Sequence, residues 1–91
     1  MNLFQIRKKI DKLDFELINI LSKRTKLIQD VAKYKQKNRI PLIQDQRMSS
    51  MFKKRKDLAK KLNLDPEFIK HIFLNIVNES IKIQKKLVGK T

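Results

Sequence analysis

Residues 3–34 read LFQIRKKIDKLDFELINILSKRTKLIQDVAKY, and this stretch carries the clearest structural signal in the chain. Its apolar side chains alternate three and four positions apart, as in the a and d positions of a heptad repeat. The stripe consists of Leu3, Ile6, Ile10, Leu13, Leu17, Ile20, Leu27, Val31 and Tyr34. This spacing predicts one long helix, which at about 1.5 Å per residue measures roughly 50 Å.

Local signals at both ends support this helix. Asn2 with Gln5 resembles a capping box, in which each side chain accepts a hydrogen bond from the backbone of the other residue. At the other end, Pro41 forces Ile40 out of helical geometry. The long helix is therefore expected to begin near residue 3 and to end before Ile40.

A second, shorter helix is predicted after the loop at Pro41, with Asp45 as its cap. Its apolar residues at helical spacing are Met48, Met51, Phe52, Leu58, Ala59 and Leu62. Asn63 and Leu64 are expected to end it, since the periodicity stops there.

A third helix is predicted from Asp65 to about Val88. Asp65 followed by Pro66 is a strong start signal, because the aspartate can cap the helix and proline is tolerated in the first turn. The apolar face consists of Ile69, Ile72, Phe73, Ile76, Val77, Ile81 and Leu87. Ser80 and Gln84 interrupt this face with polar groups. We expect an all-α fold of three helices in a single domain over residues 1–91.

The composition agrees with this fold class. The 91 residues contain one glycine, two prolines and no cysteine, which disfavours tight turns and disulfides and indicates a reducing compartment. Neither a signal peptide nor a membrane span is predicted, so we expect a soluble cytoplasmic protein. The formal charge of +14 favours anionic partners without specifying which.

The length of the first helix predicts a homodimer. A compact domain of this size has a radius of gyration near 12 Å and a diameter of roughly 30 Å, which the helix exceeds. Two shorter helices cannot cover the whole apolar stripe, and an antiparallel second copy is the simplest way to do so.

Cations in apolar positions are the first candidates for a functional site. Arg24 occupies an a position where leucine or isoleucine is expected, although pairing with Glu79 or snorkelling to the rim would also explain it. Lys35 lies eleven residues further, on the same side of the helix and roughly 16 Å away. Long side chains at these positions can converge on one small molecule, whereas an exposed Lys35 is the simpler alternative.

Ser80 and Gln84 lie four residues apart on one face of the third helix and could line a polar pocket or bond to each other or to the backbone. His71, the only histidine, is expected to have a surface or packing role. A cysteine nucleophile, metal-ligand spacing and a phosphate-binding glycine loop are all absent from the sequence. We therefore expect a reaction without metal, cofactor or covalent intermediate.

Taken together, an ordered set of residues resembles the all-helical class of chorismate mutases, which are intertwined dimers of three-helix chains. The set consists of Ile6-Arg7-Lys8-Lys9-Ile10, Leu13-Asp14, Leu21-Ser22-Lys23-Arg24, Val31-Ala32-Lys33-Tyr34-Lys35, Ile40-Pro41, Arg47, Ser80 and Gln84. The resemblance spans nearly the whole chain. It implies the Claisen rearrangement of chorismate to prephenate, a step of aromatic amino-acid biosynthesis in the shikimate pathway.

The resemblance also implies a role for each residue. The pocket would contain Arg24, Lys35, Arg47, Ser80 and Gln84, with Arg7 reaching in from the other chain. Arg7 and Arg24 would hold the two carboxylates of the substrate, and Ser80 would hydrogen-bond one of them. Lys35 and Gln84 would donate to the ether oxygen, where negative charge grows. Arg47 would support this cationic wall. Arg7 lies about 25 Å from Arg24 along the helix, too far to share a ligand within one chain.

Two positions depart from the family pattern. Members commonly carry an aspartate and a glutamate that accept from the ring hydroxyl, whereas this chain has Gln44 and Met48. Met48 is a weak acceptor and is equally well explained as a core methionine. The substrate could therefore be isochorismate, as in the related pyruvate lyases, or an amino analogue, as for an aminodeoxychorismate mutase.

Two other classes of function stay open. A basic helical dimer could bind nucleic acid, given clusters such as residues 53–56, but the cations are spread over all three helices and few aromatic residues can stack on bases. We therefore do not expect nucleic acid as the partner. A homologue without catalytic activity, or with a purely regulatory role, is the other alternative.

Overall fold

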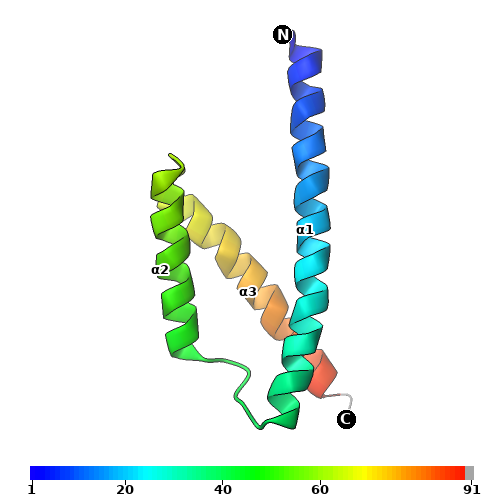
Figure 1. Ribbon diagram of the computed structural model, residues 1–91, viewed down its shortest axis with the longest axis vertical. Helices are drawn as coiled ribbons and strands as arrows, with labels where there is room; N and C mark the ends of the chain where they lie inside the picture. The colour runs from blue at the N-terminus through cyan, green and yellow to red at the C-terminus, as the bar shows by residue number, and fades with distance from the viewer. Residues whose placement is uncertain (90–91) are drawn as a thin grey trace.

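The computed structural model describes residues 1–89, and all regular structure within them is helical. The three helices are α1 (Leu3–Lys37), α2 (Asp45–Lys61) and α3 (Pro66–Val88). The chain measures 54 × 26 × 15 Å and its radius of gyration is 16.5 Å, well above the roughly 12 Å of a compact domain of this length. This elongation comes from α1, which extends beyond the other two helices (Figure 1).

The capping box predicted for α1 is present. Gln5 N donates to Asn2 Oδ1 over 2.9 Å, and Asn2 N donates to Gln5 Oε1 over 3.0 Å. The helix ends at Lys37, before Ile40 as expected, and Asn38 closes it by donating from its side-chain nitrogen to the Tyr34 carbonyl over 2.9 Å. The chain then turns at Arg39, whose φ of 55° is left-handed.

The start of α2 differs from the prediction by one residue. Asp45 is the first helical residue rather than the cap, and the cap position belongs to Gln44, whose side chain makes no capping hydrogen bond. The Asp45 carboxylate still favours the helix, because it lies in the first turn near the positive end of the helix dipole. The side chain of Gln44 is consequently available for another role.

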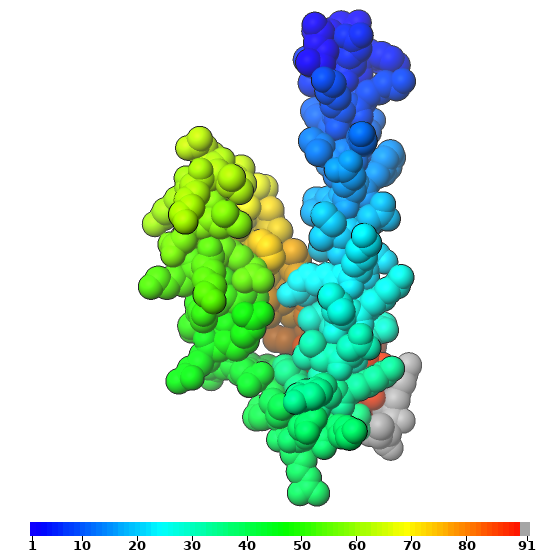
Figure 2. Space-filling model, in the orientation of Figure 1, coloured from blue at the N-terminus to red at the C-terminus, as the bar shows by residue number. Residues whose placement is uncertain are grey.

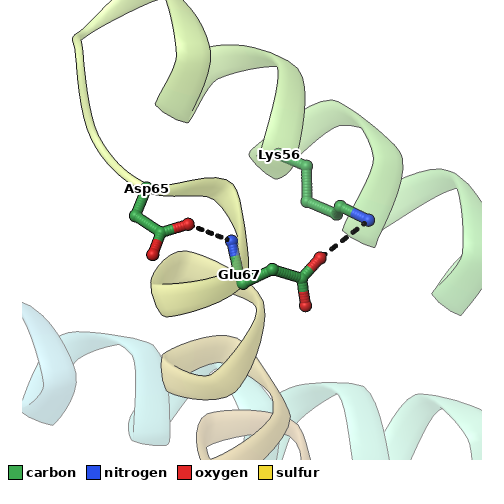
Figure 3. Close-up of polar contacts among 3 residues, drawn as sticks. All are labelled: Lys56, Asp65 and Glu67. Carbon is green, nitrogen blue, oxygen red and sulfur yellow. Dashed lines mark hydrogen bonds and ion pairs between the residues drawn. The ribbon is translucent and has the colours of Figure 1, made fainter.

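The start of α3 agrees with the prediction and also connects α3 to α2. Asp65 Oδ1 accepts a hydrogen bond from Glu67 N over 3.0 Å, and Pro66 occupies the first turn. Glu67 Oε1 in turn lies 3.7 Å from Lys56 Nζ of α2 (Figure 3). Since both side chains of this ion pair remain partly exposed to solvent, it orients the α2–α3 turn more than it stabilises the fold.

Helix α3 packs against both α1 and α2 and so connects the other two helices. The buried apolar residues are Ala32, Met51, Ala59 and Val77, and the buried polar residues are Ser80 and Gln84. Such a small core agrees with the thin core expected of a short chain. Its centre is partly polar, because Ser80 and Gln84 lie within it.

The apolar stripe of α1 is not covered. All of its nine apolar residues are exposed, from 38% at Val31 to 64% at Leu27, and every residue from 1 to 20 is exposed. Figure 2 shows this amino-terminal half standing clear of the rest of the chain. The prediction that α2 and α3 cannot cover the stripe is therefore confirmed.

None of the three helices within residues 1–89 combines the length and hydrophobicity of a membrane span.

Candidate active site

A cavity of about 190 Å³ lies where the carboxyl-terminal half of α1, the amino-terminal half of α2 and α3 come together. In Figure 2 the surface is hollowed between α1 and α2, with α3 behind. The lining residues are Arg24, Ile28, Val31, Lys35, Leu42, Gln44, Arg47, Met48, Met51, Val77, Ser80, Ile81 and Gln84. The structure thus brings together every site residue predicted from the sequence except Arg7.

Arg24 is held at the cavity wall by α3. Its Nη1 donates to Ser80 Oγ over 2.6 Å, and Ser80 Oγ donates to the Ile76 carbonyl over 2.8 Å. The pairing of Arg24 with Glu79, considered from the sequence, is not among the ion pairs of residues 1–89. Arg24 is therefore oriented by a neutral hydroxyl and keeps its full positive charge for a ligand.

Lys35 approaches the cavity from the next turns of α1. Its Nζ donates to the Leu42 carbonyl over 2.7 Å and to Gln84 Oε1 over 3.2 Å. Because Lys35 uses the amide oxygen of Gln84, the Gln84 side chain has its NH₂ group to offer to a ligand. Lys35 is half-buried and not the ordinary surface lysine of the simpler alternative.

The electrostatics of the cavity are strongly positive. Arg24, Lys35 and Arg47 line it, and none of its lining residues within the described part of the chain carries a carboxylate. Burial lowers the pKa of Arg24, with a further contribution from repulsion by Arg47, and burial also lowers the pKa of Lys35. Crowded cations without counter-charges are unfavourable in an empty site, and an anionic ligand removes this penalty.

Gln44, at the cap position of α2, and Met48 line the cavity on its α2 side, together with Arg47 and Met51. Gln44 is exposed, and because its side chain makes no capping hydrogen bond, its amide can turn toward a ligand. Met48 is half-buried and lines the cavity with its thioether. Both positions that depart from the family pattern therefore lie in the site, where they supply one neutral acceptor and one apolar surface.

Arg7 lies far from this cavity in its own chain. It is exposed on the amino-terminal half of α1, and the seventeen residues that separate it from Arg24 correspond to about 25 Å along a helix. Within one chain, Arg7 therefore cannot contact a ligand bound to Arg24.

Arg55 is a further cation near the site that was not predicted from the sequence. Its Nη1 donates to the Met51 carbonyl over 3.3 Å, and its guanidinium carbon lies 5.0 Å from the centroid of the Phe73 ring. The pKa of Arg55 is lowered by burial and by repulsion from Arg47 and Arg24. The available signal was spacing, because Arg55 follows Met48 by seven residues and Met51 by four, and so lies on the same side of α2 as these two cavity-lining residues.

No group of three or more histidine, cysteine, aspartate or glutamate side chains within residues 1–89 is placed to hold a metal ion. His71 is exposed on α3, in agreement with the surface role expected for it.

Comparison with known proteins finds the same family that the sequence resembles. The sequence model of the family described as chorismate mutase type II matches residues 6–85. A bifunctional chorismate mutase/prephenate dehydratase of Buchnera aphidicola subsp. Schizaphis graminum is 35% identical over 89 residues, which are 98% of this chain and 23% of the relative. A chorismate mutase of Methanocaldococcus jannaschii is 29% identical over 98% of this chain and 90% of the relative. A T-protein of Haemophilus influenzae is 29% identical over 94% of this chain and 23% of the relative.

Proposed function

This chain belongs to the chorismate mutase type II family, and we propose from this premise that it catalyses the rearrangement of chorismate to prephenate. The reaction is an isomerisation, in which a carbon–oxygen ether bond breaks while a carbon–carbon bond forms. No proton need be transferred in this step. The observation that carries the proposal is a cavity that residues 1–89 line with three cations and no carboxylate, and in which Ser80 and Gln84 are buried.

The cations of the cavity suit a substrate with two carboxylates. Arg24, oriented by Ser80, can hold one carboxylate through paired charge-assisted hydrogen bonds. Arg47 adds positive charge from α2. Fixing both ends of a flexible substrate favours the folded conformer in which the reacting carbons meet, and such positioning contributes several kcal/mol to many reactions.

We propose that Lys35 and Gln84 stabilise the transition state. Lys35 Nζ donates to Gln84 Oε1 over 3.2 Å, so the NH₂ group of the same amide lies near the ammonium group and one ligand atom can accept from both. We assign this atom to the ether oxygen, because negative charge grows there as the bond breaks. The hydrogen bond from Lys35 to the Leu42 carbonyl holds the ammonium group in place before substrate binds.

We further propose that two chains form an intertwined homodimer in which Arg7 of each completes the cavity of the other. The uncovered stripe of α1 supports this, since nine exposed apolar residues along one helix favour association. Leu27, Val31 and Tyr34 of the same stripe, with Ile40, line a shallow apolar hollow beside the cavity. An antiparallel partner helix would cover both and bring its Arg7 toward Arg24.

The chain spans about a quarter of the length of the bifunctional relatives that it matches, but most of the Methanocaldococcus relative. We propose that residues 1–91 act as one mutase domain in the cytoplasm, because a polar dicarboxylate must be converted in the compartment that holds it. The prephenate dehydratase activity of the bifunctional relatives is not assigned to this domain.

The test of the function is direct. Purified protein mixed with chorismate should consume the diene absorbance and yield prephenate. Parallel reactions with isochorismate, followed by assays for pyruvate and salicylate, test the alternative that Gln44 and Met48 left open. If neither substrate is consumed while duplex DNA binds with a steep salt dependence, the enzymatic proposal is wrong and the nucleic-acid alternative holds.

A further inference from the structure

Arg55 is a charged residue near the cavity, and no acidic side chain within residues 1–89 forms an ion pair with it. It lies one helical turn beyond Met51, whose side chain lines the cavity. Two contacts fix its guanidinium: the hydrogen bond to the Met51 carbonyl and the stacking over the Phe73 ring. The charge is therefore held in one place behind the cavity wall and does not sample the solvent freely.

The surroundings of this guanidinium are unfavourable for the empty protein. Arg55 is half-buried and takes part in none of the ion pairs of residues 1–89. The charges that act on it are those of Arg47 and Arg24, and both repel it. A protein selected for folding alone would gain by placing an apolar residue over Phe73 at this position.

We propose that Arg55 is a specificity-determining residue, whose fixed charge behind Met51 makes the site prefer a substrate with two carboxylates over one with a single carboxylate. The inference rests on the proposed function and adds a fourth cation to Arg24, Lys35 and Arg47. Arg55 acts through the field that it adds, without touching the substrate. Two charges separated by roughly 10 Å across a partly solvated site change an affinity by about three- to fivefold.

The charge can be separated from the packing by a pair of substitutions. Arg55→Gln removes the charge but keeps a donor for the Met51 carbonyl, whereas Arg55→Lys keeps the charge and loses the planar fork. Lys54→Gln is the matched control, because Lys54 is the exposed neighbour on α2 and the variant has the same net charge as Arg55→Gln.

The measurement compares steady-state kinetics on chorismate and on chorismate with one carboxylate blocked as a methyl ester. Arg55→Gln should raise KM for chorismate about fifteenfold and for the monoester about fourfold, with kcat within about twofold of wild type. Arg55→Lys and Lys54→Gln should stay close to wild type. The loss in Arg55→Gln should shrink when the ionic strength is raised to about 1 M.

Several outcomes would overturn this role. An Arg55→Gln variant with the wild-type preference for the dianion would do so, as would an Arg55→Lys variant as impaired as Arg55→Gln, since the residue would then act by packing. Wild-type protein that turns over neither compound would remove the proposed function itself and this role with it. If Arg55→Gln does not fold, Arg55→Met, which keeps an apolar contact with Phe73, takes its place under the same criteria.

Discussion

The amino-terminal half of α1 and the remainder of the chain depart from ordinary globular design in opposite ways. Residues 3–20 place apolar side chains in solvent, whereas residues 21–88 bury polar groups and crowd cations around a cavity. Each half therefore lacks something that a single chain does not supply. The exposed apolar stripe lacks a covering surface, and the cationic cavity lacks an anion. A second chain bound through α1, with a dicarboxylate in the cavity, would satisfy both.

The largest effect should come from breaking the amino-terminal half. Replacing Leu13 and Leu17 with glutamate should weaken the dimer by at least about 1000-fold, because unpaired charges would be buried twice in a symmetric interface. Both side chains are more than half exposed in the single chain, so loss of contacts within one chain is not expected to contribute. The molecular mass from sedimentation equilibrium and the rate of chorismate turnover should fall together when both are measured at the same protein concentration.

Lys12→Glu is the control for this change, because Lys12 lies on the same helix outside the apolar stripe. It should leave both the mass in solution and the turnover close to wild type. A double leucine variant that keeps the wild-type mass and activity would show that the stripe is not an interface.

The next effect should come from the cavity half. Lys35→Ala should lower kcat by about 100-fold or more, since a positioned cation at developing charge contributes about 3 kcal/mol or more to catalysis. The helical circular dichroism should change little. Lys33→Ala, at an exposed position two residues away, should keep wild-type turnover. A Lys35→Ala variant with wild-type kcat would remove this residue from the mechanism.

A smaller effect, on pH dependence, sharpens the same contrast. Burial lowers the pKa of Lys35. In the free enzyme, the Lys35 ammonium group should therefore lose a proton at a lower pH than an exposed lysine, which titrates at about pH 10.4. The activity, measured as kcat/KM, should therefore fall as the pH rises through that lowered pKa. The contribution of Lys35 to the free energy of unfolding should rise over the same range, because the unfolded chain keeps the lysine proton to a higher pH than the folded chain does. Rate profiles and thermal midpoints measured between pH 7 and about 11 test both signs. An activity that stays flat beyond pH 10.4 would contradict the account.

Much of the fold was predictable because it depends on local rules. The heptad spacing and the Asn2–Gln5 capping box predicted α1, and the Asp65–Pro66 start predicted α3, since each signal acts within a few residues. The start of α2 was misplaced by one residue at Asp45, because a carboxylate favours the cap and the first turn almost equally.

The site was predictable where a residue broke an apolar pattern, as Arg24, Ser80 and Gln84 do. Arg55 was missed because it stands in the basic run of residues 53–56, and the sequence does not show which of these cations contacts Phe73. Which face of α1 contacts α3 was also beyond the sequence pattern. The buried residue of α1 is Ala32, next to the stripe, while the nine apolar residues of the stripe itself stay exposed.

The central claim is that the amino-terminal half of one chain completes the cavity of another. It is tested most directly by refolding Arg7→Ala chains together with Arg24→Ala chains, each inactive alone. Random pairing makes half of the dimers hybrids with one intact site each, so about a quarter of wild-type turnover should return. Arg24→Ala mixed with Lys35→Ala should recover nothing, because both residues line the same cavity. If the mixture of Arg7→Ala and Arg24→Ala chains is no more active than either variant alone, the shared site is contradicted.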